Sequence, residues 1–447
     1  MSDTPQADAL AHLAAEGEQQ QDYWHREFAW LLKHRFVSII TTDHRNSDLR
    51  KSLCAELSLN PGWIRRNKYP ELALGSLHAR LRPLLMNGHA LSLDISDIGP
   101  AVSISAAVDT LCIQTAHAHA GLGTPATDAP LTISVSGAAS GLQDFLQTQR
   151  DQSELPVRFA IRLPVAHKTT RLAEPESADK QRLHKELWRD LLILGHNCAG
   201  ISLVPSATTR ELSCLHARER GNTVMPAGLF EVPANSAWLN LHLNVHRCFD
   251  KNGNVENARL HRILKTTLRL ADNLIDKTKW PWPGLQIDAL ANRRIAIHLV
   301  GIGELVDRSR QNPASFSTLY RLRGNLRQLK KLLLAESADL ANQRGVFPEY
   351  RVGDLVSKFS DRYGVKEAKK IVYQHALRHR HLLAISPFDV FPRHRSKYPL
   401  ADYMNLLPLI FVANTVTARG DALRHSLSLK QYQRTLQMAS AVFANSH

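Results

Sequence analysis

The sequence predicts an α/β fold in which many strands pair in parallel. Strand-like runs of apolar residues alternate along the chain with segments of roughly 10 to 20 residues that carry helical periodicity. Hydrophobic residues make up 44% of the 447 residues and charged residues 22%, which is the composition of a folded globular chain rather than a disordered one. A chain of this size forms either one large α/β barrel or several ordinary domains.

The amino-terminal half begins with helices and then changes to short strands. Residues 21–42 predict a helix that runs into a strand, and residues 72–85 place Leu77, Leu81 and Leu84 at helical spacing. The strands expected after residue 90 are bounded by glycine and proline, and they cover residues 91–95, 102–105, 131–135 and 157–163. We therefore expect a mainly helical region over residues 1–90 and a second domain over residues 91–447.

The carboxyl-terminal half continues the alternation with longer helices. Residues 257–276 place Leu260, Leu264, Leu268 and Ala271 on one stripe, which is typical of a helix packed on a core. The other expected helices are residues 183–194, 319–342 and 366–379, and the expected strands are residues 294–299 and 382–385.

Composition argues against several classes of protein. Residues 1–21 lack the features of a secretory signal, and no window approaches ~18 uninterrupted apolar residues, so we expect a cytoplasmic protein without membrane spans. The five cysteines are scattered and form no Cys-x-x-Cys, which indicates neither a disulfide framework nor a zinc ribbon. His375 and His379 have the spacing of one helical turn, but the sequence nearby supplies no acidic or thiolate third ligand, and we expect no metal site.

Positive charge is concentrated in one region. The net charge is +15, and residues 301–400 hold 19 lysines and arginines against 9 acidic residues. Such a basic field attracts nucleic acid, nucleotides or acidic proteins. Aromatic residues make up only 6% of the chain and are not interleaved with the basic ones, as they are in single-strand platforms. A solvated helix face therefore stays open as the alternative.

Four stretches between residues 243 and 305 follow one another in the order and at about the spacing of a known family. They are residues 243–250, the Asp-Asn-x-Ile-Asp helix end at 272–276, the proline-marked turn at 280–283, and residues 291–305, which begin Ala-Asn-Arg-Arg-Ile. Together they resemble the catalytic large subunit of ribonucleotide reductases, especially the adenosylcobalamin-dependent class. The resemblance implies a ten-stranded α/β barrel for residues 91–447, with a finger loop through its centre that carries the catalytic tip.

The residues that match the family's catalytic tip have lost its reactive groups. The family's tip is Asn-Pro-Cys-Gly-Glu, and the matching residues here are Met225, Pro226, Ala227, Gly228 and Leu229. In the family the cysteine holds a thiyl radical that abstracts hydrogen from the ribose, and the glutamate exchanges a proton with a ribose hydroxyl. The side chains of Ala227 and Leu229 can do neither, and Met225 offers only a weak thioether acceptor.

Other positions of the family's site are also changed. The cysteine that follows the tip, one of the pair that reduces the sugar, is matched by Trp238. The phosphate-gripping Pro-Thr-Gly-x-x-Ser loop is matched by residues 387–392, where Asp389 would repel a phosphate about 4 Å away by roughly 1 kcal/mol in water. The residues expected to line the remaining cleft are Phe230, Trp238, Ser386, Phe388 and Asp389. Glu231 and Cys214 are the substitutes that a different loop geometry could bring to the tip.

These observations predict a divergent ribonucleotide-reductase-like protein that lacks reductase activity and acts by binding or assembly, with a protein partner or as a homo-oligomer. Two alternatives stay open. One is a repurposed nucleotide-processing enzyme that uses Glu231, Cys214 or a histidine. The other is a module that binds nucleic acid or a partner through the basic region 301–400. Adenosylcobalamin is expected as a cofactor only if the family's activity persists.

Overall fold

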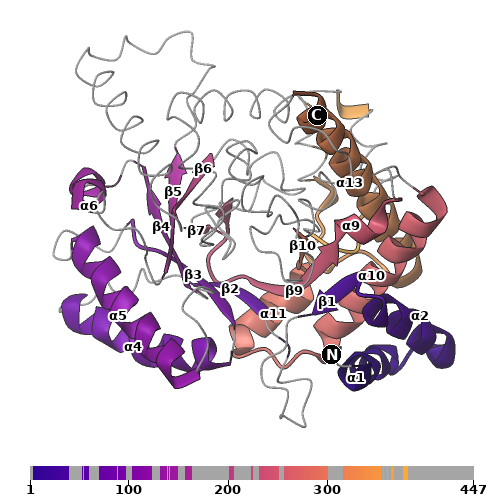
Figure 1. Cartoon of the computed structure of the whole chain (residues 1–447), viewed down its shortest axis with the longest axis horizontal. Helices are drawn as coiled ribbons and strands as arrows, with labels where there is room; N and C mark the ends of the chain where they lie inside the picture. The colour runs from indigo at the N-terminus through magenta and orange to yellow at the C-terminus, as the bar shows by residue number, and fades with distance from the viewer. Residues whose placement is uncertain are drawn as a thin grey trace.

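A curved sheet of eight strands, with helices on its outer side, forms the body of the protein (Figure 1). The computed structural model describes most of the first 353 residues in segments, and a few short stretches beyond them. The described ranges are 4–39, 55–59, 70–87, 89–96, 103–122, 131–137, 141–148, 157–163, 201–205, 223–224, 231–250, 256–300, 316–353, 364–366 and 376–380, with the single residues 53, 139, 356 and 360.

The sheet consists of two blocks of parallel strands that meet antiparallel. Every neighbouring pair from β2 to β6 is parallel, and β10 is parallel to β9. The blocks join where β9 pairs antiparallel with β1 and β2. The strands of this sheet are β1 (Val37–Ile39), β2 (Ala55–Leu59), β3 (Ala90–Asp94), β4 (Leu131–Ser136), β5 (Arg158–Leu163), β6 (Ile201–Pro205), β9 (Ala237–Asn244) and β10 (Ile295–Val300).

Apolar residues on one face of the strands explain where the helices pack. Leu239, Leu241 and Leu243 alternate with polar residues along β9, and all three are fully buried in the core that also holds the apolar stripe of α10. Burial of one such leucine contributes about 2 kcal/mol. The helices are α1 (Thr4–Ala15), α2 (Gln21–Lys33), α4 (Pro70–Met86), α5 (Ile104–Leu122), α6 (Leu142–Thr148), α9 (Val245–Cys248), α10 (Asn257–Lys277), α11 (Pro283–Asn292) and α13 (Phe316–Arg344).

Local residues set the ends of the later helices. Pro283 stands in the first turn of α11, where its missing N–H costs nothing. The helix ends because Arg293 takes a left-handed backbone conformation, with φ 47° and ψ 53°. α13 ends before Gly345, whose φ of 83° is readily adopted by glycine.

The two amino-terminal helices dock on α10 through arginine and aromatic side chains. The guanidinium carbon of Arg262 lies 3.9 Å from the ring centre of Trp30, and that of Arg269 lies 4.3 Å from the ring of Trp24. Arg262 also donates two hydrogen bonds to the carboxylate of Glu27. The aromatic residues of α2 therefore attach this helix to α10.

Most of the predicted elements are confirmed, since α2, β1, α4, β3, β4, β5, α10, β10 and α13 all occur where the periodicity placed them. The predicted strand at 102–105 is wrong, because residues from Ile104 onward form α5. Ser103 accepts a hydrogen bond from the backbone N–H of Ala106 at 3.1 Å and so caps that helix. The predicted helix 366–379 is also wrong at its end, where residues 376–380 are not helical.

Three further expectations can be compared with the described residues. The described strands form an open sheet, so a closed ten-stranded barrel stays a prediction. The boundary near residue 90 also stays a prediction, although β1 and β2 join the same sheet as the later strands. None of the described helices combines the length and the apolar character that crossing a membrane demands.

Replacing Arg262 by alanine should loosen the amino-terminal helices. The loss of its stacking on Trp30 is expected to lower the free energy of unfolding by about 1 kcal/mol, measured by urea denaturation. Arg262→Lys keeps the charge beside Glu27 but removes the planar stacking group. Its free energy of unfolding should therefore lie between those of the natural protein and Arg262→Ala. Equal stability of all three proteins would contradict the proposed attachment.

Candidate functional site

The second face of the sheet is polar and yet buried. Ser58, Ser92, Thr132 and Ser134 all point to this face, and each is fully buried. The register places Ser58 opposite Ser92, and Ser92 opposite Thr132, so the hydroxyl groups form a row across β2, β3 and β4. A buried hydroxyl group that lacks a hydrogen bond is costly, and such a row indicates an inner surface built to hold polar groups. We call it the inner face.

A short hairpin packs against the inner face. Its strands β7 (Thr223–Val224) and β8 (Glu231–Val232) pair antiparallel, and β7 lies within the curve of the sheet (Figure 1). The Thr223 hydroxyl lies 3.0 Å from that of Ser92 and 3.4 Å from that of Ser134, and Ser92 donates to the carbonyl of Val224. Residues 225–230, which include the sequence-predicted tip, connect these two strands.

A partly buried ion pair lies at the carboxyl ends of β3 and β5, the parallel strands on either side of β4. Arg162 donates from Nε to Asp94 Oδ2 at 3.0 Å, and Ser134 donates to the same oxygen at 2.8 Å. Arg162 also donates from Nη2 to the Ser96 hydroxyl at 3.2 Å. Burial raises the pKa of Asp94, and the charge of Arg162 opposes that rise. Ligands of parallel α/β sheets bind outside the carboxyl ends of the strands, so this cluster is a candidate for acid–base or ligand contact.

Trp238 fills part of the same face. Its side chain is 1% exposed, and its Nε1 donates to the Ser236 hydroxyl at 3.0 Å. That hydroxyl lies 2.7 Å from the Ser58 hydroxyl, so the indole joins the hydroxyl row. The Arg294 guanidinium carbon lies 5.5 Å from the ring centre. A buried, hydrogen-bonded indole therefore stands at the position that the resemblance assigns to a reducing cysteine.

The carboxyl halves of β9 and β10 carry a second polar cluster on the inner face. His242 lies opposite Ser38 of β1 and His298 of β10, and Asn244 follows two residues later on the same face. The two imidazole rings meet edge to face with centres 5.2 Å apart. Burial, together with the neighbouring His298, holds the pKa of His242 well below its usual value, so this imidazole is neutral at pH 7.

The structure describes only part of the sequence-predicted site. Trp238 is among the described residues, and it lies on the inner face. Glu231 lies in β8, paired with Val224. The remaining predicted site residues lie outside the described residues; they are Cys214, Met225, Ala227, Leu229, Phe230, Ser386, Phe388 and Asp389. Sequence reasoning missed Asp94 and Arg162, although a charged residue at the end of each of two apolar strands was a visible signal.

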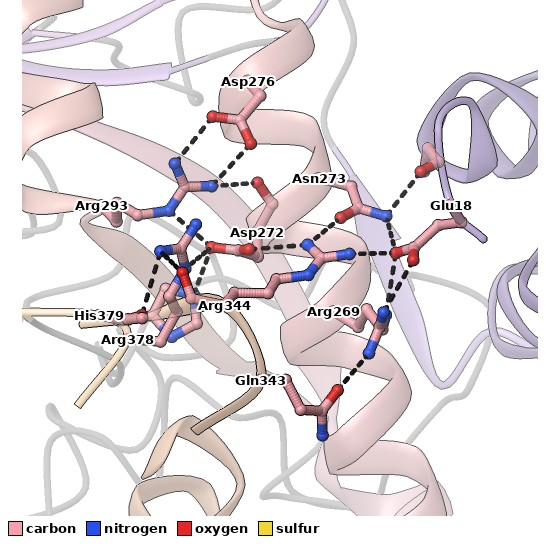
Figure 2. A network of polar contacts seen from close by, with 12 residues as sticks. Glu18, Arg269, Asp272, Asn273, Asp276, Arg293, Gln343, Arg344, Arg378 and His379 are labelled. Carbon is pink, nitrogen blue, oxygen red and sulfur yellow. Dashed lines mark hydrogen bonds and ion pairs between the residues drawn. The ribbon is translucent and has the colours of Figure 1, made fainter. Parts of the chain in front are cut away.

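The motifs that carry the resemblance meet in a buried ion cluster on the helical side of the protein. Asp272 is fully buried and accepts hydrogen bonds from Arg293 at 2.6 Å, Arg344 at 2.9 Å and Arg378 at 3.0 Å (Figure 2). Arg293 also binds the carboxylate of Asp276 with two nitrogens. The Asp-Asn-x-Ile-Asp and Asn-Arg-Arg-Ile motifs therefore join α10 to the end of α11.

His379 also belongs to this cluster. Its Nε2 lies 3.2 Å from Asp272 Oδ1, and the side chain is fully buried. Burial would raise the pKa of Asp272, but the contact with His379 and the charges of Arg293 and Arg378 hold that pKa well below its usual value. Asp272 is therefore ionised at neutral pH and balances the arginines around it.

The same network extends to the amino-terminal helices through Glu18. This carboxylate accepts hydrogen bonds from Arg269 at 2.9 and 2.8 Å and from the Asn273 amide at 2.8 Å, and it also pairs with Arg344 (Figure 2). Burial opposes ionisation, but these donors lower the pKa of Glu18 to about 2. Residues from the start and from the later part of the chain thus share one set of charges.

Asp272→Asn is expected to destabilise the protein strongly. Removing this carboxylate leaves three guanidinium groups facing a neutral amide in a buried site, which typically costs about 3 to 5 kcal/mol. Asp276→Asn is the matched control, because it contacts the same Arg293 but its side chain is 48% exposed, and it should cost far less. Chemical denaturation of both variants measures the difference, and equal losses would contradict the central role of Asp272.

Stability should fall in mild acid because of His89. Its Nδ1 accepts the backbone N–H of Ala55 at 3.1 Å, and burial lowers its pKa from 6.5 to about 4. The unfolded chain therefore binds a proton at His89 between these values while the folded chain does not, so stability is lost as pH falls below 6.5. The loss attributable to His89 is roughly 2 kcal/mol at about pH 5.

The variant His89→Asn isolates this contribution, because it keeps an acceptor for Ala55 without a titrating group. Its free energy of unfolding, measured by urea denaturation across this pH range, should fall less steeply toward acid than that of the natural protein. Parallel pH profiles for the two proteins would show that His89 does not titrate as expected.

Comparison with known proteins identifies a related family. Residues 235–389 match the family model described as the ribonucleotide reductase barrel domain. The chain is also similar to the vitamin B12-dependent ribonucleoside-diphosphate reductases of two Mycobacterium tuberculosis strains, CDC 1551 / Oshkosh and ATCC 25618 / H37Rv. Each is 26% identical over 169 residues, which cover 33% of this chain and only 24% of the relative. Over the matched part of the chain, these similarities support a ribonucleotide-reductase large-subunit-like family, on the side of the vitamin B12-dependent class.

Proposed function

We propose that this chain is a ribonucleotide-reductase-like protein without ribonucleotide reductase activity, which acts by binding or by assembly with a protein partner or a second copy of itself. The observation that carries the proposal is the placement of Trp238. An indole that is 1% exposed and hydrogen-bonded to Ser236 occupies the inner face where reduction of a sugar would need a thiol. Trp238 has no redox-active sulfur.

The residues at the expected tip support the same conclusion. Hydrogen abstraction by a thiyl radical needs a sulfur atom, and Ala227 has only a methyl group at that position. Leu229 cannot exchange a proton with a ribose hydroxyl because it does not titrate. The hairpin of β7 and β8 nonetheless contacts the inner face, where the hydroxyl groups of Thr223 and Ser92 are within hydrogen-bond distance. We propose that residues 225–230 form the finger loop of a ten-stranded barrel, retained without its reactive groups.

The residues present do not fit the chemistry of adenosylcobalamin. This cofactor supplies a carbon radical that must be passed to a protein group before it reaches the ribose. The sequence offers no thiol at the tip to receive it, because Ala227 replaces the cysteine. We therefore derive no reaction step through adenosylcobalamin for this chain.

A direct assay tests the proposal. The full chain, incubated with ribonucleoside diphosphates and triphosphates, adenosylcobalamin and a dithiol, should yield no deoxyribonucleotide by mass spectrometry. A vitamin B12-dependent ribonucleoside-diphosphate reductase in the same mixture provides the positive control. Deoxyribonucleotide formed by this chain would overturn the proposal. If Ala227→Ser formed it at the same rate, the radical would be carried by a residue other than Ala227.

A second candidate, a repurposed enzyme, is favoured by the cluster at Asp94. Burial raises the pKa of the Asp94 carboxyl group, which makes it a stronger base than a free aspartate, and Asp94 is linked through Ser134 to the hairpin residue Thr223. Under this alternative, the chain would convert a nucleotide-like compound in a panel screen, and Asp94→Asn would abolish that conversion. A screen without turnover leaves the binding function as the assignment.

A further inference from the structure

A groove of about 310 Å³ lies between α10 and α13, on the helical side of the protein. The two helices contact each other and run side by side (Figure 1). Pockets that bind small molecules have volumes of about 300 to 1,000 Å³, so this groove is large enough for a small compound. We call it the helix groove. Its lining includes His261, Lys265 and Leu268 of α10 and Glu336, Asp339 and Leu340 of α13.

The two walls of the helix groove carry opposite charges. On α10, Lys265 follows His261 by one turn and lies on the same face of the helix. On α13, Asp339 follows Glu336 by three residues and likewise shares its face. Lys265 and Asp339 are both exposed, and neither forms an ion pair with another of the described residues. A basic wall thus stands against an acidic one, and each has a charge that a ligand can neutralise.

One carboxylate of the acidic wall is buried without a hydrogen bond. Glu336 is 4% exposed, and its Oε1 accepts no hydrogen bond from the described part of the chain. Nδ1 of His261 lies 2.8 Å from that oxygen, but the imidazole is charged only when it is protonated, and its side chain is 50% exposed. Burial raises the pKa of Glu336; the charges of His261 and Lys265 oppose this rise, and that of Asp339 adds to it. Because a buried carboxylate is costly unless a cation pairs with it, an ammonium group that displaces the half-exposed imidazole would be a favourable partner.

A ligand that carries both an ammonium and a carboxylate group matches both walls. Its ammonium can donate to Glu336 and Asp339, and its carboxylate can accept from the ammonium of Lys265. Such charge-assisted hydrogen bonds are about twice as strong as neutral ones. Leu268 and Leu340 supply the apolar part of the lining, which suits an aliphatic side chain. A metal ion fits less well, since no three His, Cys, Asp or Glu side chains of the described residues are gathered to hold one.

We propose that the helix groove binds a free α-amino acid with an aliphatic side chain. The ammonium group of the ligand lies against the acidic wall of α13, and its carboxylate lies against Lys265 of α10. Arg269 also lines the groove, but its guanidinium group is already bound to Glu18 and Gln343 (Figure 2), which leaves the ligand's carboxylate to Lys265. This site is separate from the inner face and does not depend on the proposed loss of reductase activity.

Binding measurements on the full chain test the site. Alanine, valine, leucine and isoleucine are screened by the rise in melting temperature that a bound ligand causes, and those that raise it are titrated by calorimetry. Each amino acid that binds is compared with two compounds that lack one of its charged groups. For L-leucine these are isocaproate, which has no ammonium group, and isoamylamine, which has no carboxylate. The amino acid should bind at one saturable site, about tenfold or more tighter than either compound.

Variants of the two walls locate the ligand. Lys265→Gln and Asp339→Asn each remove one exposed charge, so both should keep the fold, and each should weaken binding about tenfold or more. Glu336→Gln should abolish binding, and the two exposed variants decide the question if it does not fold. Glu256→Gln is the matched control, because this carboxylate is 60% exposed and precedes α10 outside the lining of the groove. It should bind as the natural protein does.

Each of three outcomes would overturn the proposal. The first is that none of the aliphatic amino acids binds. The second is that isocaproate or isoamylamine binds as tightly as L-leucine, because only one wall would then be used. The third is that folded Lys265→Gln or Asp339→Asn binds as tightly as the natural protein, which would place the ligand elsewhere. None of these measurements involves deoxyribonucleotide formation, so the groove and the proposed function can be judged separately.

Discussion

The need to satisfy polar groups buried on the inner face governs much of this structure. A sheet covered on both sides would normally carry apolar residues on both faces, as parallel sheets often do. Here the outward residues of β3 and β4 are leucine, isoleucine and valine, and the inward ones, after Ala90 at the start of β3, are serine, threonine and aspartate. Each inward hydroxyl then requires a partner, and the backbone and side chains of the β7–β8 hairpin supply several of them. The hairpin is thereby held against the inner face.

Charge, rather than apolar contact alone, joins the outer layer of helices. Asp272 faces Arg293, Arg344 and Arg378, and these partners offset the cost of burying its charge, because an unpaired buried ion is strongly destabilising. The Asp-Asn-x-Ile-Asp and Asn-Arg-Arg-Ile motifs supply the centre of this arrangement. The family resemblance therefore rests at these positions on residues that maintain the fold, which explains how it can persist beside an altered tip.

Sequence reasoning predicted most elements because their periodicity is strong. The stripe of Leu260, Leu264 and Leu268 identified α10, and alternating residues identified β3, β4 and β5. The strand predicted at 102–105 was wrong because a run of four residues can be either a strand or the first turn of a helix. The hydrogen bond by which Ser103 caps α5 favours the helix. In the site, Trp238 was singled out through the resemblance alone. The contacts of Ser92 with Thr223 join residues 131 positions apart and leave no local pattern to read.

The double pairing of Glu18 ties the amino end of the protein to a helix end 326 residues further along the chain. Arg344, at the last position of α13, shares this carboxylate with Arg269 of α10. A shortened chain that began after residue 18 would leave both guanidinium groups without their counter-charge in a partly buried site. Trimming the first two helices would therefore do more than remove a surface appendage, since it would weaken a junction on which the late part of the fold relies.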